Sequence, residues 1–409
     1  ERIELCLCRG KKMRSWFVVS AALLVAFASA EEDEKLPKKT NVKLDKGTTL
    51  VLFGTRHGNR NPETFVEVPD RSWGQEGELE LTSIGKRQAY GLGKEVREFI
   101  GAKQLIGKNF QPSEAKFYSS SANRCQMTLQ SALAGLYDPS GYADWNKKNF
   151  EHWSPVPYSI DDPLLRMYSV KGCVNSDKAW EPVSKDTLPD LVELANKSKP
   201  LLEYIAKNEP KRKGSISDAA DVADNILQMD FYKAKYPDWL AKPTLPGYDA
   251  KSIKAAYLNF VEAHTIRCAN HAPCRDLMGG LWLQHILSSF DSAAQGKGPK
   301  LIGYASHTEV TLSLMKLMGI DKKELTTSAG FVFEFKKDKD SGLVRLLNHD
   351  PNPIDAHVIY KSKLEPELAK SANSDGWIPL DKLKEFTKKR IISDWQTACG
   401  IDLCSTKKL

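Results

Sequence analysis

The sequence lacks any apolar run long enough to cross a membrane as a helix. Such a helix needs about 20 consecutive apolar residues, and the one candidate, residues 16–30, is shorter and is followed directly by acidic residues. Internal repeats, low-complexity segments and a skewed composition are also missing, since 41% of the 409 residues are apolar and 27% are charged. These features exclude disordered, collagen-like and coiled-coil proteins. We expect no membrane partner, and either two or three globular domains or one large α/β unit with an insertion.

A strong excess of one charge is missing as well. The net charge of +7 falls to +4 once residues 1–30 are set aside, because that segment holds five basic and two acidic residues. The basic runs at residues 211–213 and 388–390 are short and are expected to be solvated surface. The sequence therefore predicts no nucleic-acid partner.

Residues 13–30 have the pattern of a secretory signal peptide. The segment begins with a methionine and an arginine, continues with apolar residues and ends in a small-x-small cleavage site at residues 28–30. Residues 1–12 precede this methionine and are expected to be a translated leader without function. The pattern predicts secretion, with the lysosomal lumen as the alternative. The sequon at Asn196 predicts an exposed, N-glycosylated position.

Cysteine is scarce, with eight residues, and the CxxC pairs typical of zinc sites are absent. Six cysteines follow the predicted signal peptide, an even number that favours three disulfides in an oxidising compartment. Sequence alone permits 15 pairings, and pairing between near neighbours is one of them. Its bridges would be Cys399–Cys404, Cys268–Cys274 and Cys125–Cys173. We expect no metal site and no cofactor.

Three short apolar runs, each followed by a small or polar segment and a helix, indicate the core of the fold. The expected strands are residues 50–53, 115–118 and 301–305, and the expected helices are 83–100, 122–136, 281–290 and 310–318. This order of strand, loop and helix predicts an α/β fold. In such folds the loops at the carboxyl ends of the strands bind ligands.

The remaining segments predict a hairpin and an insertion. Residues 331–335 and 343–347 are expected to form a β-hairpin at the edge of the sheet. Residues 142–275 lack strong strand signals and predict a mainly helical insertion. The core would then consist of residues 45–141 and 276–395.

The ends of the three expected strands carry ionisable side chains, most of them basic. These side chains are Arg56, His57, Arg60, Arg124, His307 and Glu309. If the strands are parallel, their carboxyl ends share one edge and these side chains converge. Several arginines around one point repel each other unless an anion lies between them, and their planar guanidinium groups match phosphate oxygens. The pattern predicts a binding site for a phosphoryl group.

His57 is the candidate nucleophile of this site. An imidazole nitrogen can accept a phosphoryl group covalently, and the reaction then depends mainly on positioning and charge stabilisation. The neighbouring guanidinium groups are expected to lower the pKa of His57, so that the imidazole stays neutral and nucleophilic in mild acid. The sequence therefore predicts an acidic working pH.

Five motifs in this order resemble the histidine acid phosphatases. They are Arg56-His57-Gly58-Asn59-Arg60-Asn61-Pro62, Glu80-Leu81-Thr82-x-x-Gly85, Arg124 after the serine-rich strand end, Gly279-Gly280-x-x-Leu283, and Tyr304-Ala305-Ser306-His307. The resemblance covers residues 45–360. It implies a three-layer α/β sandwich with a mixed, mostly parallel sheet and a helical cap domain. It also implies hydrolysis of phosphate monoesters without a metal, with a phosphohistidine on His57, and with Arg56, Arg60, Arg124 and His307 as phosphate ligands.

One position departs from the pattern of that family. The family usually has an aspartate directly after the second histidine, where it protonates the leaving group, and this sequence has Thr308. Glu309 is the candidate replacement, and a His-x-Glu variant exists in the branch that resembles inositol polyphosphate phosphatases. The alternative is that Glu309 only begins the following helix, where the helix dipole favours a carboxylate.

The missing aspartate leaves a second class of function open. The protein would then be a weak or inactive phosphatase-like secreted protein that binds small amines or lipids between core and cap. Its pocket would be lined by aromatic residues such as Trp145, Trp153, Tyr168 and Trp180.

Overall fold

The computed structural model describes residues 36–68, 71–101, 104–145, 153–338, 341–352 and 354–401. The predicted leader, the predicted signal peptide and Cys404 lie outside these residues. The described chain from Pro37 onward belongs to one compact unit. Within the described part of the chain, no helix is both long and apolar enough to span a membrane.

A mixed sheet forms the centre of the fold, and its described residues make eight strands in the order β3-β2-β4-β1-β5-β6-β7, with β8 paired to β6. The strands are β1 Thr48–Arg56, β2 Ala115–Ser119, β3 Ser159–Ile160, β4 Leu301–Ser306, β5 Gly330–Asp338, β6 Ser341–Pro351, β7 His357–Lys361 and β8 Trp377–Pro379. The pairs among β3, β2, β4 and β1 are parallel, and the other described pairs are antiparallel. The predicted α/β fold with a mixed sheet is confirmed, but the sheet is parallel in one half rather than mostly parallel.

The predicted hairpin exists as β5 and β6, which pair from Gly330 with His349 to Asp338 with Ser341. Its predicted place at the edge of the sheet is wrong. β5 also pairs with β1, and β6 also pairs with β7 and β8. The hairpin is therefore internal, which agrees with the nearly continuous burial of both strands. A fully buried hairpin and an edge hairpin differ in their neighbours, and the local sequence does not specify these.

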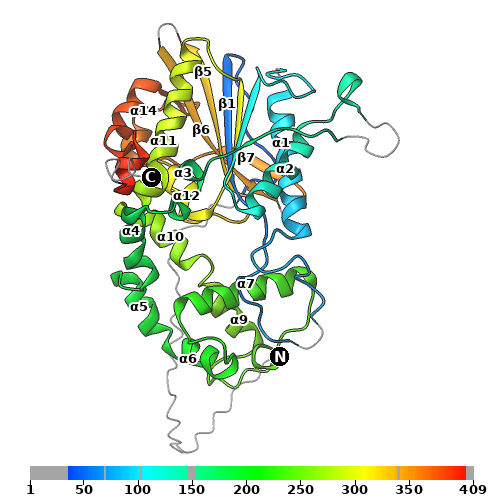
Figure 1. Cartoon of the computed structure of the whole chain (residues 1–409), viewed down its shortest axis with the longest axis vertical. Helices are drawn as coiled ribbons and strands as arrows, with labels where there is room; N and C mark the ends of the chain where they lie inside the picture. Colours follow the sequence, from blue (N-terminus) through cyan, green and yellow to red (C-terminus); the bar gives the residue numbers. More distant parts are fainter. Residues whose placement is uncertain are drawn as a thin grey trace, which may run out of the picture. The chain divides into compact units, whose positions relative to one another are not determined.

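Helices cover both faces of the sheet and make it the middle of three layers (Figure 1). Alternate residues of β1 enter two separate apolar cores. Val51 and Phe53 pack with α1 and α2, and Leu50 and Leu52 belong to the core that contains α11 and α12. This alternation is the period of two expected of a strand buried on both faces.

The four predicted helices of the core are present as α1, α2, α11 and α12, although α11 begins at residue 272 rather than 281. The sequence does not predict α13, α14 or α15. The core helices are α1 Ser83–Gly101, α2 Asn123–Leu136, α11 Ala272–Ala294, α12 Thr308–Leu317, α13 Pro366–Ala369, α14 Leu380–Thr387 and α15 Trp395–Cys399, with short 3₁₀ turns η1 Gly141–Ala143 and η3 Lys388–Arg390.

The segment predicted as an insertion is mainly helical in its described part. It contains α3 Asp162–Leu165, η2 Met167–Ser169, α4 Val174–Ser184, α5 Pro189–Lys197, α6 Lys199–Asn208, α7 Ile216–Tyr232, α8 Asp238–Ala241, α9 Ala250–Leu258 and α10 Ala263–Asn270. Helices α5, α6, α7 and α9 gather apart from the sheet (Figure 1). The segment also supplies β3 to the sheet. Asn196 lies exposed near the end of α5.

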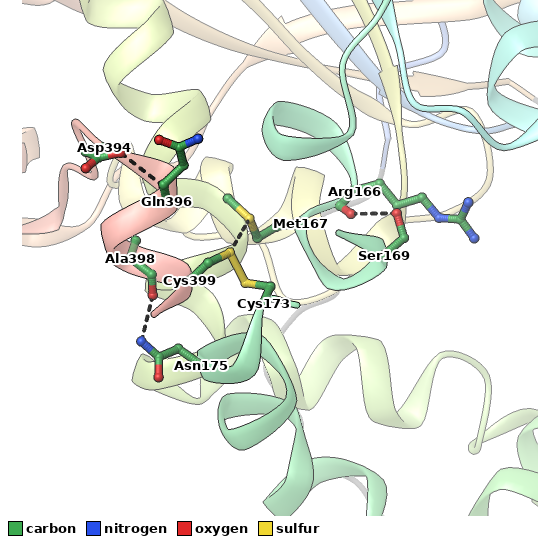
Figure 2. Close-up of a disulfide and its surroundings, with 9 residues drawn as sticks. All are labelled: Arg166, Met167, Ser169, Cys173, Asn175, Asp394, Gln396, Ala398 and Cys399. Atoms are coloured by element: carbon green, nitrogen blue, oxygen red, sulfur yellow. Dashed lines mark hydrogen bonds between the residues drawn. A yellow bond between two sulfur atoms is a disulfide. The ribbon is translucent and has the colours of Figure 1, made fainter. Parts of the chain in front are cut away.

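One disulfide has the predicted partners and another does not. Cys268 and Cys274 are joined, as near-neighbour pairing predicts. Cys399 is joined to Cys173 instead of Cys404, although 226 positions separate the two in sequence. The bridge links α15 to the start of α4, and Asn175 donates a hydrogen bond to the carbonyl of Ala398 beside it (Figure 2).

The predicted bridge from Cys125 to Cys173 is therefore wrong, and so is the expectation that all six cysteines pair. Cys125 is a buried free thiol. It lies in α2, and its Sγ donates to the carbonyl of Ser306 at 3.2 Å. Cys125 is buried where α2 packs on the end of β4, and an even count of cysteines does not indicate such a buried thiol.

Candidate active site

The parallel half of the sheet brings the predicted site residues together. Arg56 at the end of β1 lies opposite Ser306 at the end of β4, and the end of β2 lies on the other side of β4. The rings of His57 and His307 follow these ends, with centroids 5.7 Å apart. The predicted convergence of charged side chains at the carboxyl ends of the strands is present in the structure.

A close approach of two glycines positions the loop that carries His57. A Cβ atom on Gly58 would lie 2.5 Å from the carbonyl oxygen of Gly85 in α1, and one on Gly85 would lie 2.2 Å from the carbonyl oxygen of Asn59. The backbone N–H of His57 donates to the carbonyl of Ser306 at 2.9 Å. This packing explains why the Arg-His-Gly motif and the Thr-x-x-Gly motif occur together.

The hydrogen bonds of His57 leave one ring nitrogen available. Its Nδ1 lies 2.9 Å from the carbonyl oxygen of Gly58, and because a carbonyl only accepts, Nδ1 carries the proton. Nε2 then holds a lone pair. Burial, followed by the positive charges of Arg124 and Arg56, holds the pKa of His57 well below its ordinary value. The lowered pKa favours the neutral imidazole, whose Nε2 lone pair is then available to attack an electrophile.

His307 contacts the arginine supplied by α2. The guanidinium of Arg124 donates to Nδ1 of His307 at 3.3 Å, so Nε2 of His307 carries its proton and faces the hydroxyl of Ser120 at 2.9 Å. Burial and the charge of Arg124 lower the pKa of His307 well below its ordinary value. The buried Nε atom of Arg124 has no hydrogen-bond partner among the described residues.

Two acidic residues of the helical segment pair with the arginines that flank His57. Glu262, before α10, forms a buried ion pair with Arg56, and Asp224 of α7 lies 3.0 Å from Arg60. Burial raises the pKa of Asp224 to about 6. Burial acts in the same direction on Glu262, but the charges of Arg56 and Arg60 outweigh it and lower the pKa of that carboxyl. These two acids cannot be identified from the sequence, because nothing in their local pattern distinguishes them from surface residues.

Glu309 and Thr308 have different partners at the start of α12. Thr308 contacts Glu262 through its hydroxyl. Glu309 is buried, with 6% of its surface exposed, and it accepts a hydrogen bond from Tyr168. Burial, together with the negative charge of Glu262, raises the pKa of Glu309 above its ordinary value. A raised pKa extends the pH range over which this carboxyl group keeps its proton, compared with a helix-capping residue exposed to water.

Tyr168 is one of four aromatic residues that the sequence associates with a pocket. Its ring lies 5.6 Å from the ring of His307 and stacks on Trp180. Trp145 and Trp153 instead pack on each other. Arg166, two residues before Tyr168, is a further arginine at the site that the sequence analysis did not single out. Within the described ranges, no three His, Cys, Asp or Glu side chains are grouped so that they could hold a metal ion.

A family model, the histidine phosphatase superfamily (branch 2), matches residues 29–347. The chain belongs to this family. It is 23% identical to the prostatic acid phosphatase of Rattus norvegicus, over 88% of this chain and 92% of that protein. It is 22% identical to the lysosomal acid phosphatase of Xenopus laevis, over 86% of this chain and 78% of that protein.

The structure of the Hafnia alvei phytase in its apo form is also similar, with a TM-score of 0.63 and 14% identity over 87% of this chain and 99% of that one. At this identity the likeness concerns the fold alone. The histidine phosphatase fold predicted from the motifs is confirmed.

Proposed function

We propose that this histidine phosphatase is a secreted acid phosphatase that hydrolyses phosphate monoesters through a phosphohistidine on His57. The observation that carries the proposal is the unprotonated Nε2 of a buried histidine among several arginines. Arg56, Arg60, Arg124 and His307 are the proposed ligands of the phosphoryl group. Their hydrogen bonds and positive charges stabilise the negative charge on the phosphoryl oxygens during transfer, which is the main requirement of this chemistry.

In the first step, Nε2 of His57 attacks phosphorus and the bond from phosphorus to the ester oxygen breaks. Glu309, protonated because its pKa is raised, gives its proton to the leaving oxygen, and the alcohol departs. The proton on Nδ1 stays in its hydrogen bond to Gly58, which stabilises the positive charge on the phosphorylated imidazole. Arg124 and His307, which contact each other, bind the equatorial oxygens, and His307 does so by turning its Nε2 proton from Ser120 to the phosphoryl group.

In the second step, a water molecule attacks the phosphohistidine. The ionised Glu309 takes a proton from this water, the bond between phosphorus and Nε2 breaks, and inorganic phosphate is released. Both His57 and Glu309 return to their starting protonation states. One carboxyl group therefore acts as acid in the first step and as base in the second.

The same groups account for the proposed acidic working range. Below its raised pKa, the proposed donor Glu309 is protonated. The lowered pKa of His57 keeps the nucleophile neutral at the same pH. The loaded donor and the complete set of phosphate ligands favour an enzyme over the ligand-binding alternative. The predicted signal peptide supports secretion, and the lysosomal acid phosphatases among the relatives give the lysosomal lumen as the second location.

The proposal is tested by trapping the intermediate. Wild type incubated with ³²P-labelled substrate and quenched in base is expected to retain label that is released by acid, as expected for a phosphohistidine. His57→Ala is expected to abolish both labelling and turnover, and EDTA is expected to leave wild-type turnover unchanged. His271→Ala, at the start of α11, is the control for loss of a histidine. Turnover by His57→Ala comparable to wild type would overturn the mechanism.

A further inference from the structure

Arg166 differs from the arginines beside His57 in its charge balance. Arg56 and Arg60 each form an ion pair with a carboxylate. Within the described part of the chain, no carboxylate lies within ion-pair distance of Arg166. Asp162 attracts Arg166 electrostatically but forms no ion pair with it. A partly buried guanidinium without a carboxylate in direct contact retains attraction for an external anion.

The hydrogen bonds of Arg166 leave donors unused. Its Nε atom is buried and has no partner among the described residues. One Nη atom reaches the hydroxyl of Ser121 at 3.4 Å, a distance at which a hydrogen bond is weak. The guanidinium carbon lies 5.5 Å from the centre of the Tyr168 ring. Because a guanidinium group has five N–H donors, Arg166 can bind a carboxylate or phosphate while keeping these contacts.

The backbone fixes Arg166 beside the strand ends. The hydroxyl of Ser306, one residue before His307, donates to the carbonyl of Leu165 at 2.6 Å. The next residues are held by the C-terminal disulfide, since Met167 contacts Cys399. Figure 2 shows the Arg166 side chain extending away from this disulfide. The contacts that hold this segment in place therefore lie on one side of it, and the guanidinium group of Arg166 lies on the other.

Tyr168 shows where Arg166 lies relative to the phosphoryl group. Tyr168 contacts both Arg166 and Glu309, and Glu309 is the proposed donor to the leaving oxygen. The alcohol part of a substrate begins at that oxygen. Tyr168 also lies beside His307, a proposed ligand of the phosphoryl group. Arg166 is therefore close to the phosphoryl group and within reach of the alcohol attached to it.

We propose that Arg166, with Ser121 and Tyr168, binds a second anionic group carried by the alcohol part of the substrate. A carboxylate or a second phosphate has the planar or tetrahedral oxygens that a guanidinium group recognises. The proposal rests on the proposed phosphatase function and names its substrate class, which is phosphate monoesters of anionic alcohols.

The test compares matched substrates in wild type and in Arg166→Ala. Glycerol 1-phosphate carries no second anion, 3-phosphoglycerate carries a carboxylate, and glycerol 1,3-bisphosphate carries a phosphate. Removal of a charged hydrogen-bond partner is expected to lower kcat/KM for the latter two about 10- to 100-fold. The value for glycerol 1-phosphate is expected to change less than about 3-fold, and Arg166→Lys is expected to fall between wild type and Arg166→Ala because it keeps the charge but loses the paired donors.

The control variant is Arg87→Ala, which removes an exposed arginine of α1 that pairs with Asp355 and is expected to change no substrate preference. An equal loss for all three substrates, or no loss for any, would overturn the assignment of Arg166. Loss for one anionic substrate alone identifies the second group as carboxylate or phosphate. If wild type hydrolyses none of the three, the proposed function fails, whereas hydrolysis without an effect of Arg166→Ala refutes the subsite alone.

Discussion

We expect the protonation state of one carboxyl group, Glu309, to decide whether the protein hydrolyses phosphate esters efficiently or only binds phosphate. The usual aspartate position holds Thr308, whose hydroxyl contacts Glu262 and cannot protonate a leaving oxygen. Glu309 is buried, and the pKa of its carboxyl is raised. The structure thus offers a physical reason why a carboxyl group one residue further along the helix can donate the proton.

The first prediction concerns the leaving group. Glu309→Gln is expected to slow hydrolysis of an alkyl phosphate by about 10²-fold or more, the usual effect of losing a general acid. Phosphoenzyme formation from p-nitrophenyl phosphate is expected to slow less, because p-nitrophenolate leaves without protonation. Rapid-quench measurement of both substrates tests this difference.

Thr308→Val is the matched control, since it keeps the shape of the side chain and removes the hydroxyl. It is expected to keep the wild-type ratio between alkyl and nitrophenyl substrates. If Glu309→Gln has the same ratio between alkyl and nitrophenyl substrates as wild type, Glu309 is not the proton donor.

A second prediction concerns the free thiol. Burial raises the pKa of Cys125 to about 11, so the thiolate is scarce near neutral pH and the sulfur is also shielded. Cys125 is expected to resist iodoacetamide in the native protein and to react after unfolding in urea, as measured by peptide mapping. Rapid modification of Cys125 in the native state would contradict the structure.

The strands and helices of the core can be predicted from local sequence patterns. The pairing of each strand with its neighbours in the sheet cannot. The run at residues 50–53 has the length and composition of a buried strand, and the structure extends it to β1. The hairpin of β5 and β6 is also evident locally. Its internal place depends on β7 and β8, which reach it from further along the chain, and the sequence carries no local mark of that pairing.

The disulfide between α4 and α15 gives a prediction for these elements. In the chain-entropy relation a bridge that closes a longer loop stabilises more, about 5 kcal/mol for Cys173–Cys399 and about 2 kcal/mol for Cys268–Cys274. The double variant Cys173→Ser/Cys399→Ser is therefore expected to lose more free energy of unfolding in urea than Cys268→Ser/Cys274→Ser. The opposite order would show that α15 is held mainly by its packing.

The candidate site as a whole combines residues that sequence analysis predicts with residues that it misses. His57, Arg124 and His307 follow strand ends and could be named from the strand, loop and helix order. Glu262 and Asp224 come from the helical segment, 206 and 164 positions after the arginines with which they pair. Only the folded chain places these acids at the arginines, so the charge balance of the site could not be predicted.

This pairing makes the anion affinity of the site depend on pH. Asp224 has its pKa raised to about 6, so it is ionised and holds Arg60 above that pH and is neutral below it. Glu262 has a lowered pKa and stays ionised through the same range. The release of Arg60 on acidification is therefore expected to strengthen anion binding as the pH falls through about 6.

Sulfate is a suitable probe because it remains a dianion over roughly pH 4.5 to 7.5. Its own titration therefore does not contribute to the pH dependence of binding. Its inhibition constant for wild type is expected to fall, meaning tighter binding, as the pH is lowered from about 7 to about 5. Asp224→Asn cannot ionise at this position, so its inhibition constant is expected to vary much less over the same range. Glu181→Gln, which alters an exposed acid of α4, is expected to follow wild type. An unchanged pH dependence in Asp224→Asn would show that another group controls the affinity, because the carboxylate that competes for Arg60 is then absent at every pH.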